Sequence, residues 1–384
     1  MIERTANVRL LKLAKTFRSI AVVGPRQSGK TTLCKITFPK KPYISLENID
    51  DREFAENDPR GFLAQFPNGA ILDEVQKVPK LFSYLQQLLD ETKKTGLFIL
   101  SGSNNFLLQE TISQTLAGRI AYIHLLPLSI DELKQNALLK NDVNIVLQKG
   151  LYPELYNKKS ISANDWYANY LNTYIERDVR QLKNIGNLSL FTKFLKLCAN
   201  RTGQILNMAS IANDCGIDNK TVLSWLSILE SSYVIYLLKP YFNNMNKRLI
   251  KSPKIYFYDT GVACALLDIE HPKEVVNHAL KGGLFENLML MELLKERLNN
   301  GKQDNLYYWR DKTGNEIDIL FEEKNKIHLV EVKSGGTIGS DYFKGIKTVS
   351  AIIGEGKIKS KLVIYGGNQH QIRQNKEIVK SWSL

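Results

Sequence analysis

The sequence, 384 residues long, contains little of what several protein classes require. Its four cysteines lie far apart and form no CxxC pair, which indicates reduced thiols rather than a zinc site or a disulfide framework. Its five histidines show no spacing typical of metal ligands. Wholly apolar runs such as 233–238 stay far below the roughly 20 residues of a membrane-spanning helix, and the first residues form no apolar signal segment. We therefore expect a cytoplasmic protein without a membrane partner.

Acidic residues are also too few to balance the charge. There are 39 Asp and Glu residues against 52 Lys and Arg residues, so the formal net charge is +13. The stretch 237–254 has no acid at all and contains five basic residues: Lys239, Lys247, Arg248, Lys251 and Lys254. Such an excess is typical of proteins that bind polyanions, although many other cytosolic proteins are basic as well. We expect DNA as a partner, with phosphate contacts from this stretch.

The first third of the chain alternates short apolar runs with helical patterns. Apolar residues follow one another within each run, which predicts strands buried on both faces, as in a parallel sheet. The predicted strands are 19–23, 43–46, 70–73, 97–101 and 120–125, and the predicted helices between them are 79–94 and 105–117. This alternation predicts a doubly wound α/β domain over residues 1–145.

The rest of the chain divides into three predicted parts. Residues 146–200 form a helical region. Residues 201–265 contain a short helix, a tight turn, a second helix and two β-rich runs around the basic stretch, a pattern typical of a winged helix. The second of these helices is the candidate recognition helix. Residues 266–384 are predicted as an α+β domain.

A phosphate-binding motif follows the first predicted strand. Residues 24–31 read GPRQSGKT and fit the pattern G-x-x-x-x-G-K-[ST] between a strand and a helix. The glycines allow backbone N–H groups to face phosphate oxygens, and the helix N-terminus adds a positive dipole. Lys30 would bridge the β- and γ-phosphates, and the Thr31 hydroxyl would bind Mg²⁺. The predicted nucleotide-binding residues are Gly24, Pro25, Arg26, Gln27, Ser28, Gly29, Lys30, Thr31 and Thr32.

Two acids end the third predicted strand. In residues 70–74, AILDE, the strand runs into Asp73 and Glu74. We expect Asp73 to hold the Mg²⁺ shell and Glu74 to orient and polarise the attacking water. The alternatives are an acidic cap on the following helix and a phosphate site without hydrolysis. We expect ATP and Mg²⁺ as cofactors, and ATP hydrolysis as the reaction.

Four charged residues in the C-terminal part form a second candidate site. Glu286 lies in a predicted helix, Asp318 on a strand, and Glu331 and Lys333 on one side of the next strand. We expect Asp318 and Glu331 to bind a divalent metal with help from Glu286, while Lys333 positions the attacking water. Glu316 shares the face of Asp318 and is a candidate accessory. Because these acids would repel one another, we expect that a cation or a substrate must be present.

These motifs together resemble a known family. Residues 22–33, 72–79, 100–104 and 116–119 resemble bacterial and archaeal AAA-type ATPases that carry a C-terminal restriction-endonuclease-like domain of unknown function. The resemblance covers nearly the whole chain, because 150–154 and 173–178 also fit it.

The resemblance assigns roles to further residues. It implies that Ser103 senses the γ-phosphate and that Arg119 acts as an arginine finger, with an ion pair to an acid as the alternative for Arg119. The order of helix acid, strand acid and E-x-K is similar to the PD-(D/E)XK nuclease core.

Two functions remain open from the sequence. The first is an Mg²⁺-dependent ATP-binding and ATP-hydrolysing protein that acts on DNA, with a C-terminal nuclease-like domain. The alternative is a nucleotide-controlled switch that binds DNA or a protein and cuts nothing. A homo-oligomer or a protein partner fits both. The expected fold is α/β: a P-loop AAA-type ATPase domain, a helical region, a winged helix and a C-terminal α+β restriction-endonuclease-like domain.

Overall fold

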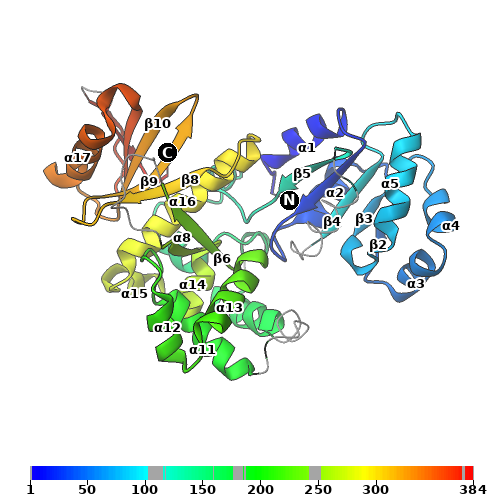
Figure 1. Cartoon of the computed structure of the whole chain (residues 1–384), viewed down its shortest axis with the longest axis horizontal. Coiled ribbons are helices and arrows are strands. Elements are labelled where there is room, and N and C mark those ends of the chain that lie inside the picture. Colours follow the sequence, from blue (N-terminus) through cyan, green and yellow to red (C-terminus); the bar gives the residue numbers. More distant parts are fainter. Residues whose placement is uncertain are drawn as a thin grey trace.

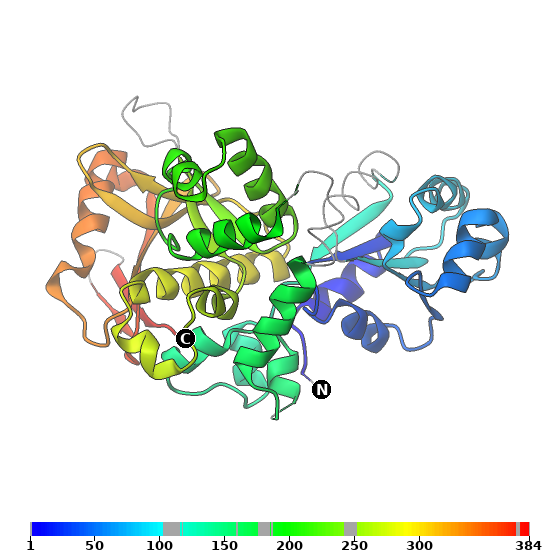
Figure 2. The same ribbon diagram turned by 90° about the horizontal axis from the view of Figure 1, so that it is seen from below.

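The computed structural model describes residues 2–102, 116, 118–158, 160–175, 185, 187–241, 252–373 and 377–383. Two sheets lie at opposite ends of an elongated molecule (Figure 1), and helices from the middle of the chain lie between them (Figure 2). No described helix is long and apolar enough to cross a membrane. The predicted helix 105–117 falls outside the described residues, apart from Leu116.

The N-terminal sheet has five strands, all paired in parallel in the order β2-β3-β4-β1-β5. Its strands are β1 (Ser19–Val23), β2 (Tyr43–Ser45), β3 (Ile71–Asp73), β4 (Phe98–Gly102) and β5 (Ile120–His124). Every residue of β1, β3 and β4 is buried, as the consecutive apolar residues predict. The predicted parallel sheet is confirmed.

Helices cover both faces of this sheet. Ile20 and Ile99 pack with Leu10 and Leu33 of the first two helices, while Leu100 packs with the third to fifth helices on the other face. The helices are α1 (Ala6–Ala14), α2 (Lys30–Thr37), α3 (Ile49–Asn57), α4 (Pro59–Ala64) and α5 (Leu81–Glu91), with a 3₁₀ turn, η1 (Val75–Lys77), before α5. The domain is therefore doubly wound, as predicted.

The middle of the chain is mainly helical. Its elements are α7 (Ile130–Gln135), α8 (Val143–Lys149), α9 (Glu154–Asn157), α10 (Ala163–Thr173), α11 (Leu188–Ala199), α12 (Met208–Cys215), α13 (Asn219–Ser231), β6 (Ile235–Pro240), β7 (Lys254–Phe257), α14 (Thr260–Leu266) and α15 (Pro272–Asn277). One hydrophobic cluster runs through these elements and continues into the C-terminal part. The middle and C-terminal parts therefore share a core.

The predicted pair of helices with a tight turn is confirmed as α12 and α13. Gly216 ends α12 in the left-handed conformation, with φ of 72°, and the Asp218 side chain accepts a hydrogen bond from the Thr221 N–H at 2.7 Å to begin α13. The strands β6 and β7 then pair antiparallel, and Ile205 forms a bridge to Lys254.

The C-terminal part is α+β, as predicted. It contains α16 (Lys281–Asn299), β8 (Leu306–Arg310), β9 (Glu316–Glu323), β10 (Lys326–Lys333), η3 (Ser340–Phe343), α17 (Lys344–Ile353), η4 (Glu355–Lys357), β11 (Ile358–Tyr365), β12 (Gln371–Ile372) and β13 (Glu377–Ser381). The strands β8, β9 and β10 pair antiparallel, and β11 pairs parallel to β10. The same sheet takes in β6, which pairs with β8 and so joins it to the middle of the chain.

Candidate nucleotide-binding site

The predicted phosphate loop connects β1 to α2 at the carboxyl edge of the parallel sheet. Gly24 and Gly29 have φ values of 148° and 92°, which other residues rarely adopt. A Cβ atom at Gly24 would also collide with the carbonyl oxygen of Leu125. Gly29 directly precedes α2, so the loop leads into a helix N-terminus. This is the backbone that a phosphate cradle requires.

Lys30 lies folded back over this loop. Its buried ammonium group donates hydrogen bonds to the carbonyl oxygens of Gly24 at 3.0 Å and Pro25 at 2.7 Å. Burial lowers the pKa of Lys30 to about 8, although the negative charges of Glu74 and Asp73 act in the opposite direction. Two carbonyl oxygens offset only part of the free-energy cost of burying the Lys30 charge. Negatively charged phosphate oxygens would offset more of that cost.

Asp73 is held by three hydroxyl groups. Its Oδ2 accepts from Thr31 Oγ1 at 2.9 Å and from Tyr43 at 2.8 Å, and its Oδ1 accepts from Ser101 Oγ at 2.5 Å. The structure therefore brings together Thr31 and Asp73, the two predicted Mg²⁺ ligands. Burial, followed by the hydrogen bond to Asp73, raises the pKa of Tyr43 to about 12.

The residues present fit a nucleotide with Mg²⁺. Oxygen atoms from one carboxylate and one hydroxyl suit this ion, which usually completes its shell with water and substrate phosphates. The described ranges contain no group of three or more His, Cys, Asp or Glu residues that could hold a metal by themselves. Ser28 Oγ is buried in the loop without a hydrogen-bond partner in the described part of the chain.

Glu74 directly follows Asp73 in a left-handed backbone conformation, with φ of 54°. Such a conformation is uncommon for a residue with a side chain and often marks a functional position. Its carboxylate accepts a hydrogen bond from the Gln76 amide. The alternative of an acidic helix cap is wrong, because α5 begins at Leu81 with Lys80 at its N-cap.

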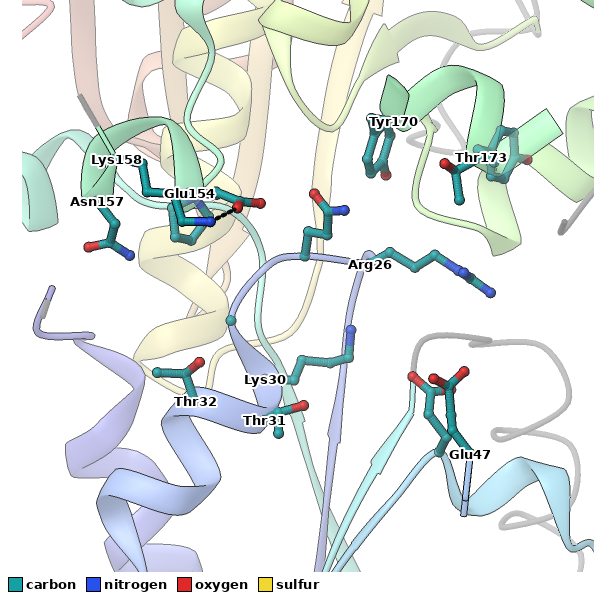
Figure 3. A pocket seen from close by; sticks show the side chains of 15 residues that line it. Arg26, Lys30, Thr31, Thr32, Glu47, Glu154, Asn157, Lys158, Tyr170 and Thr173 are labelled. Atoms are coloured by element: carbon teal, nitrogen blue, oxygen red, sulfur yellow. Dashed lines mark hydrogen bonds and ion pairs between the residues drawn. The ribbon is translucent and has the colours of Figure 1, made fainter. Parts of the chain in front are cut away.

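A cavity of about 540 Å³ opens in front of the loop. Its volume lies within the range of about 300–1,000 Å³ that is typical of small-molecule sites. One wall comes from the N-terminal domain and the other from residues 153–174, including α9 and α10, as Figure 3 shows. The lining residues are Arg26, Gln27, Gly29, Lys30, Thr31, Thr32, Glu47, Glu74, Pro153, Glu154, Asn157, Lys158, Tyr170, Thr173 and Tyr174.

Contacts within residues 153–174 hold the side chains of the second wall in place. Glu154 accepts hydrogen bonds from Lys158 at 2.8 Å and from the Trp166 indole at 3.1 Å. The Trp166 ring stacks on Tyr170 at a centroid distance of 5.2 Å. None of these residues is among the predicted site residues, and only Glu154 lies in a segment, 150–154, that carries the family resemblance.

Arg4 supports the phosphate loop from behind. Its guanidinium group donates to the carbonyl oxygens of Ser28 at 2.7 Å and Leu126 at 2.6 Å, and to the buried carboxylate of Glu132 at 3.1 Å. The loop is thereby tied to the segment that leads from β5 into α7. No sequence motif pointed to Arg4.

The roles predicted for two further residues stay predictions. Ser103 falls outside the described residues, so its role as γ-phosphate sensor stays a prediction. Arg119 forms a bidentate pair with Asp90 at the end of α5, with N–O distances of 2.5 and 2.9 Å. This contact corresponds to the ion-pair alternative, and the arginine-finger role stays a prediction.

The predicted C-terminal charges are close together. Val330 lies opposite Ile319, which places Glu331 beside Asp318 on the neighbouring strand. Asp318 Oδ2 accepts from the Val332 N–H at 2.8 Å, and Lys333 Nζ donates to Glu331 Oε1 at 2.6 Å. Burial, followed by the charge of Asp318, raises the pKa of Glu331 to about 8.

An unexpected residue occupies the centre of this cluster. Lys254 Nζ lies 2.9 Å from Glu286 and 2.5 Å from Glu316. Lys254 belongs to the basic stretch that we expected to contact DNA phosphates, and for this residue the expectation is wrong because its side chain is buried. Lys254 supplies part of the cation charge that we expected beside these acids, and metal binding by Asp318 and Glu331 stays a prediction. Lys247, Arg248 and Lys251 lie outside the described residues.

Comparisons with known proteins assign the N-terminal part to a known type of domain. Residues 16–134 match the family model of the AAA domain. This match supports the predicted AAA-type domain in the N-terminal part of the chain. Residues 140–273 and 281–384 match two domains of unknown function, DUF8612 and DUF4143.

Individual relatives and solved structures are also similar to the chain. It is 28% identical over 337 residues to the uncharacterized proteins Rv2008c of Mycobacterium tuberculosis and Mb2031c of Mycobacterium bovis, covering 87% of this chain and 74% of each relative. A Walker-type ATPase of Pyrococcus abyssi aligns with 70% of this chain and 96% of its own at 14% identity and a TM-score of 0.46. The RuvB branch migration motor of Thermotoga maritima aligns with 61% of this chain and 89% of its own at 16% identity and a TM-score of 0.31.

The lowered pKa of Lys30 predicts a pH dependence of ATP binding. Below about pH 8 the Lys30 ammonium group is charged and can contact the phosphates of ATP. Above about pH 8 Lys30 is mostly neutral, so it must take up a proton before it can make the same contact. We predict that the Kd for ATP rises by up to about tenfold per pH unit above this value. Titration with a fluorescent ATP analogue between neutral and alkaline pH measures this. AMP, which lacks the β- and γ-phosphates, is the control, and an equally flat profile for both ligands would contradict the assignment.

Proposed function

We propose that this protein binds ATP with Mg²⁺ and hydrolyses it in the cavity between the phosphate loop and the helices α9 and α10. The observation that carries the proposal is the contact of Thr31 with Asp73 at 2.9 Å, next to the buried Lys30 and to Glu74. These groups come from distant parts of the sequence and meet at one edge of the sheet. Each has the chemistry that phosphoryl transfer to water requires.

Each residue of the site has a separate role in binding or hydrolysing ATP. Backbone N–H groups of the loop hold the phosphates, and the Lys30 ammonium leaves the carbonyls of Gly24 and Pro25 to contact phosphate oxygens. Thr31 and Asp73 would hold Mg²⁺, which when bound neutralises the charge on the phosphates. Glu74 orients the attacking water. Because α9 and α10 form the other wall, they exclude bulk water from the reacting phosphate.

Variants of Lys30 and Glu74 separate binding from hydrolysis. Lys30→Ala should lose tight ATP binding, since it removes the buried charge that faces the phosphates. Glu74→Gln should bind ATP but hydrolyse it at least about a hundredfold more slowly, because Asp73 still binds Mg²⁺ and only water activation is lost. Equilibrium ATP binding and phosphate release measure the two effects.

Surface variants of the same domain serve as matched controls. Lys40→Ala and Glu53→Gln change the same residue types at exposed positions and should leave both quantities unchanged. Hydrolysis at the wild-type rate by Glu74→Gln would show that another group activates the water.

Action on DNA is a second proposal. It is supported by the net charge of +13 and by the order of α12, the turn at Gly216, α13 and the antiparallel strands β6 and β7, which fits a winged helix. On α13, Val222, Leu226 and Leu229 are buried, while Lys220 and Ser227 are exposed, as a recognition helix requires.

The C-terminal domain supports two versions of this second function. The order α16, β8, β9, β10, α17 and β11 fits the restriction-endonuclease-like fold that the family resemblance implies. Metal-dependent DNA cleavage by Asp318, Glu331 and Lys333 stays a prediction. The buried Lys254 in the same cluster favours the alternative, a nucleotide-controlled switch that binds without cutting.

Electrostatic binding to DNA has a quantitative signature. On duplex DNA, log K should fall against log salt concentration with a slope of about −0.9 for each phosphate that the protein neutralises. Charge reversal at Lys247, Arg248 and Lys251 should weaken binding to all sequences alike. Fluorescence anisotropy with labelled duplexes, with and without ATP, measures this. Affinity that is independent of salt, or unchanged in the triple variant, would contradict the predicted phosphate contacts.

A further inference from the structure

The C-terminal acids surround a lysine that is almost completely buried. The Lys254 side chain is 3% exposed, and its ammonium group contacts carboxylates from two elements, Glu286 on α16 and Glu316 on β9. Asp318 on β9 lies 4.0 Å away. The lysine is therefore a charged internal partner of the cluster.

Most of the carboxylate oxygens in this cluster already have partners within the chain. Glu286 Oε1 accepts from Lys254 and from the Tyr256 hydroxyl, and Glu316 pairs with Lys254 through one oxygen and with Arg310 through the other. Glu331 Oε1 is bonded to Lys333, while its Oε2 is buried without a hydrogen-bond partner among the described residues.

The charges of the cluster nearly balance. Four carboxylates, those of Glu286, Glu316, Asp318 and Glu331, face three cations, those of Lys254, Arg310 and Lys333. A divalent ion close to Glu286 and Asp318 would lie beside the Lys254 ammonium and be repelled by it. The residues present therefore do not fit a metal while Lys254 stays in place.

We propose that Lys254 takes the position that a divalent metal would occupy in the C-terminal domain. Most of the negative charge of the cluster is offset from within the chain, and the wild-type protein holds no metal there. Lys254 is the first residue of β7 and pairs with Leu238 of β6, so the same side chain anchors this strand pair to α16 and β9. Lys254 therefore links the middle part of the chain to the C-terminal part through ion pairs.

Manganese binding tests this proposal without reference to activity. All proteins carry Asp73→Asn, which removes the expected metal site of the phosphate loop, and no nucleotide is added. Electron paramagnetic resonance counts the Mn²⁺ bound to the full chain. We expect no Mn²⁺ that depends on Asp318 in the wild-type cluster. Lys254→Met, which keeps the length but not the charge, should gain one Mn²⁺, bound at least about tenfold more tightly than any Mn²⁺ at the wild-type cluster. Adding Asp318→Asn should abolish this binding.

Lys295→Met is the matched control. Lys295 is also 3% exposed and pairs with an acid of α16, Glu292, outside the cluster. Lys295→Met should lose stability because a buried lysine is removed, and thermal unfolding measures this loss. It should gain no Mn²⁺.

Two results would overturn the proposal. One is Mn²⁺ binding by the wild-type cluster that is lost in Asp318→Asn. The other is a folded Lys254→Met variant, as judged by circular dichroism, that gains no Mn²⁺. If Lys254→Met does not fold, the comparison of the wild-type cluster with Asp318→Asn still decides between the two accounts.

Discussion

The hydrogen bond from Thr31 to Asp73 is the contact on which the nucleotide site depends. The two residues belong to separate βα units, and only a parallel sheet brings the ends of their strands to the same edge. The strand β4 lies between β1 and β3 and supplies Ser101, which holds the other oxygen of the carboxylate. The register of three strands therefore fixes the position of one predicted metal ligand.

Two buried lysines show why similar residues lead to different functional conclusions. Lys30 is bonded to two carbonyl oxygens and faces a cavity of about 540 Å³, so an anionic ligand would improve its environment. Lys254 is surrounded by carboxylates and already has full ionic partners. Lys30 therefore fits a binding site for an anion, whereas Lys254 is part of the folded structure.

The parts of the site that the sequence predicted are local. The phosphate loop and the pair Asp73 and Glu74 are contiguous motifs next to apolar strands, so composition and order were sufficient to find them. Tyr43 reaches Asp73 only through the strand register, and Arg4 reaches the loop only through the tertiary fold. Lys254 was misassigned because its neighbours in sequence are basic, while its acidic partners in space lie far along the chain.

The central claim is that the cavity in front of the phosphate loop hydrolyses ATP with Mg²⁺. The most direct measurement is phosphate release from ATP by the purified wild-type chain, treated with EDTA and then titrated with Mg²⁺. We expect turnover that appears with Mg²⁺, saturates, and stops when the ion is chelated again. Turnover that continues after chelation, or bound ATP that stays intact at every Mg²⁺ concentration, would contradict it.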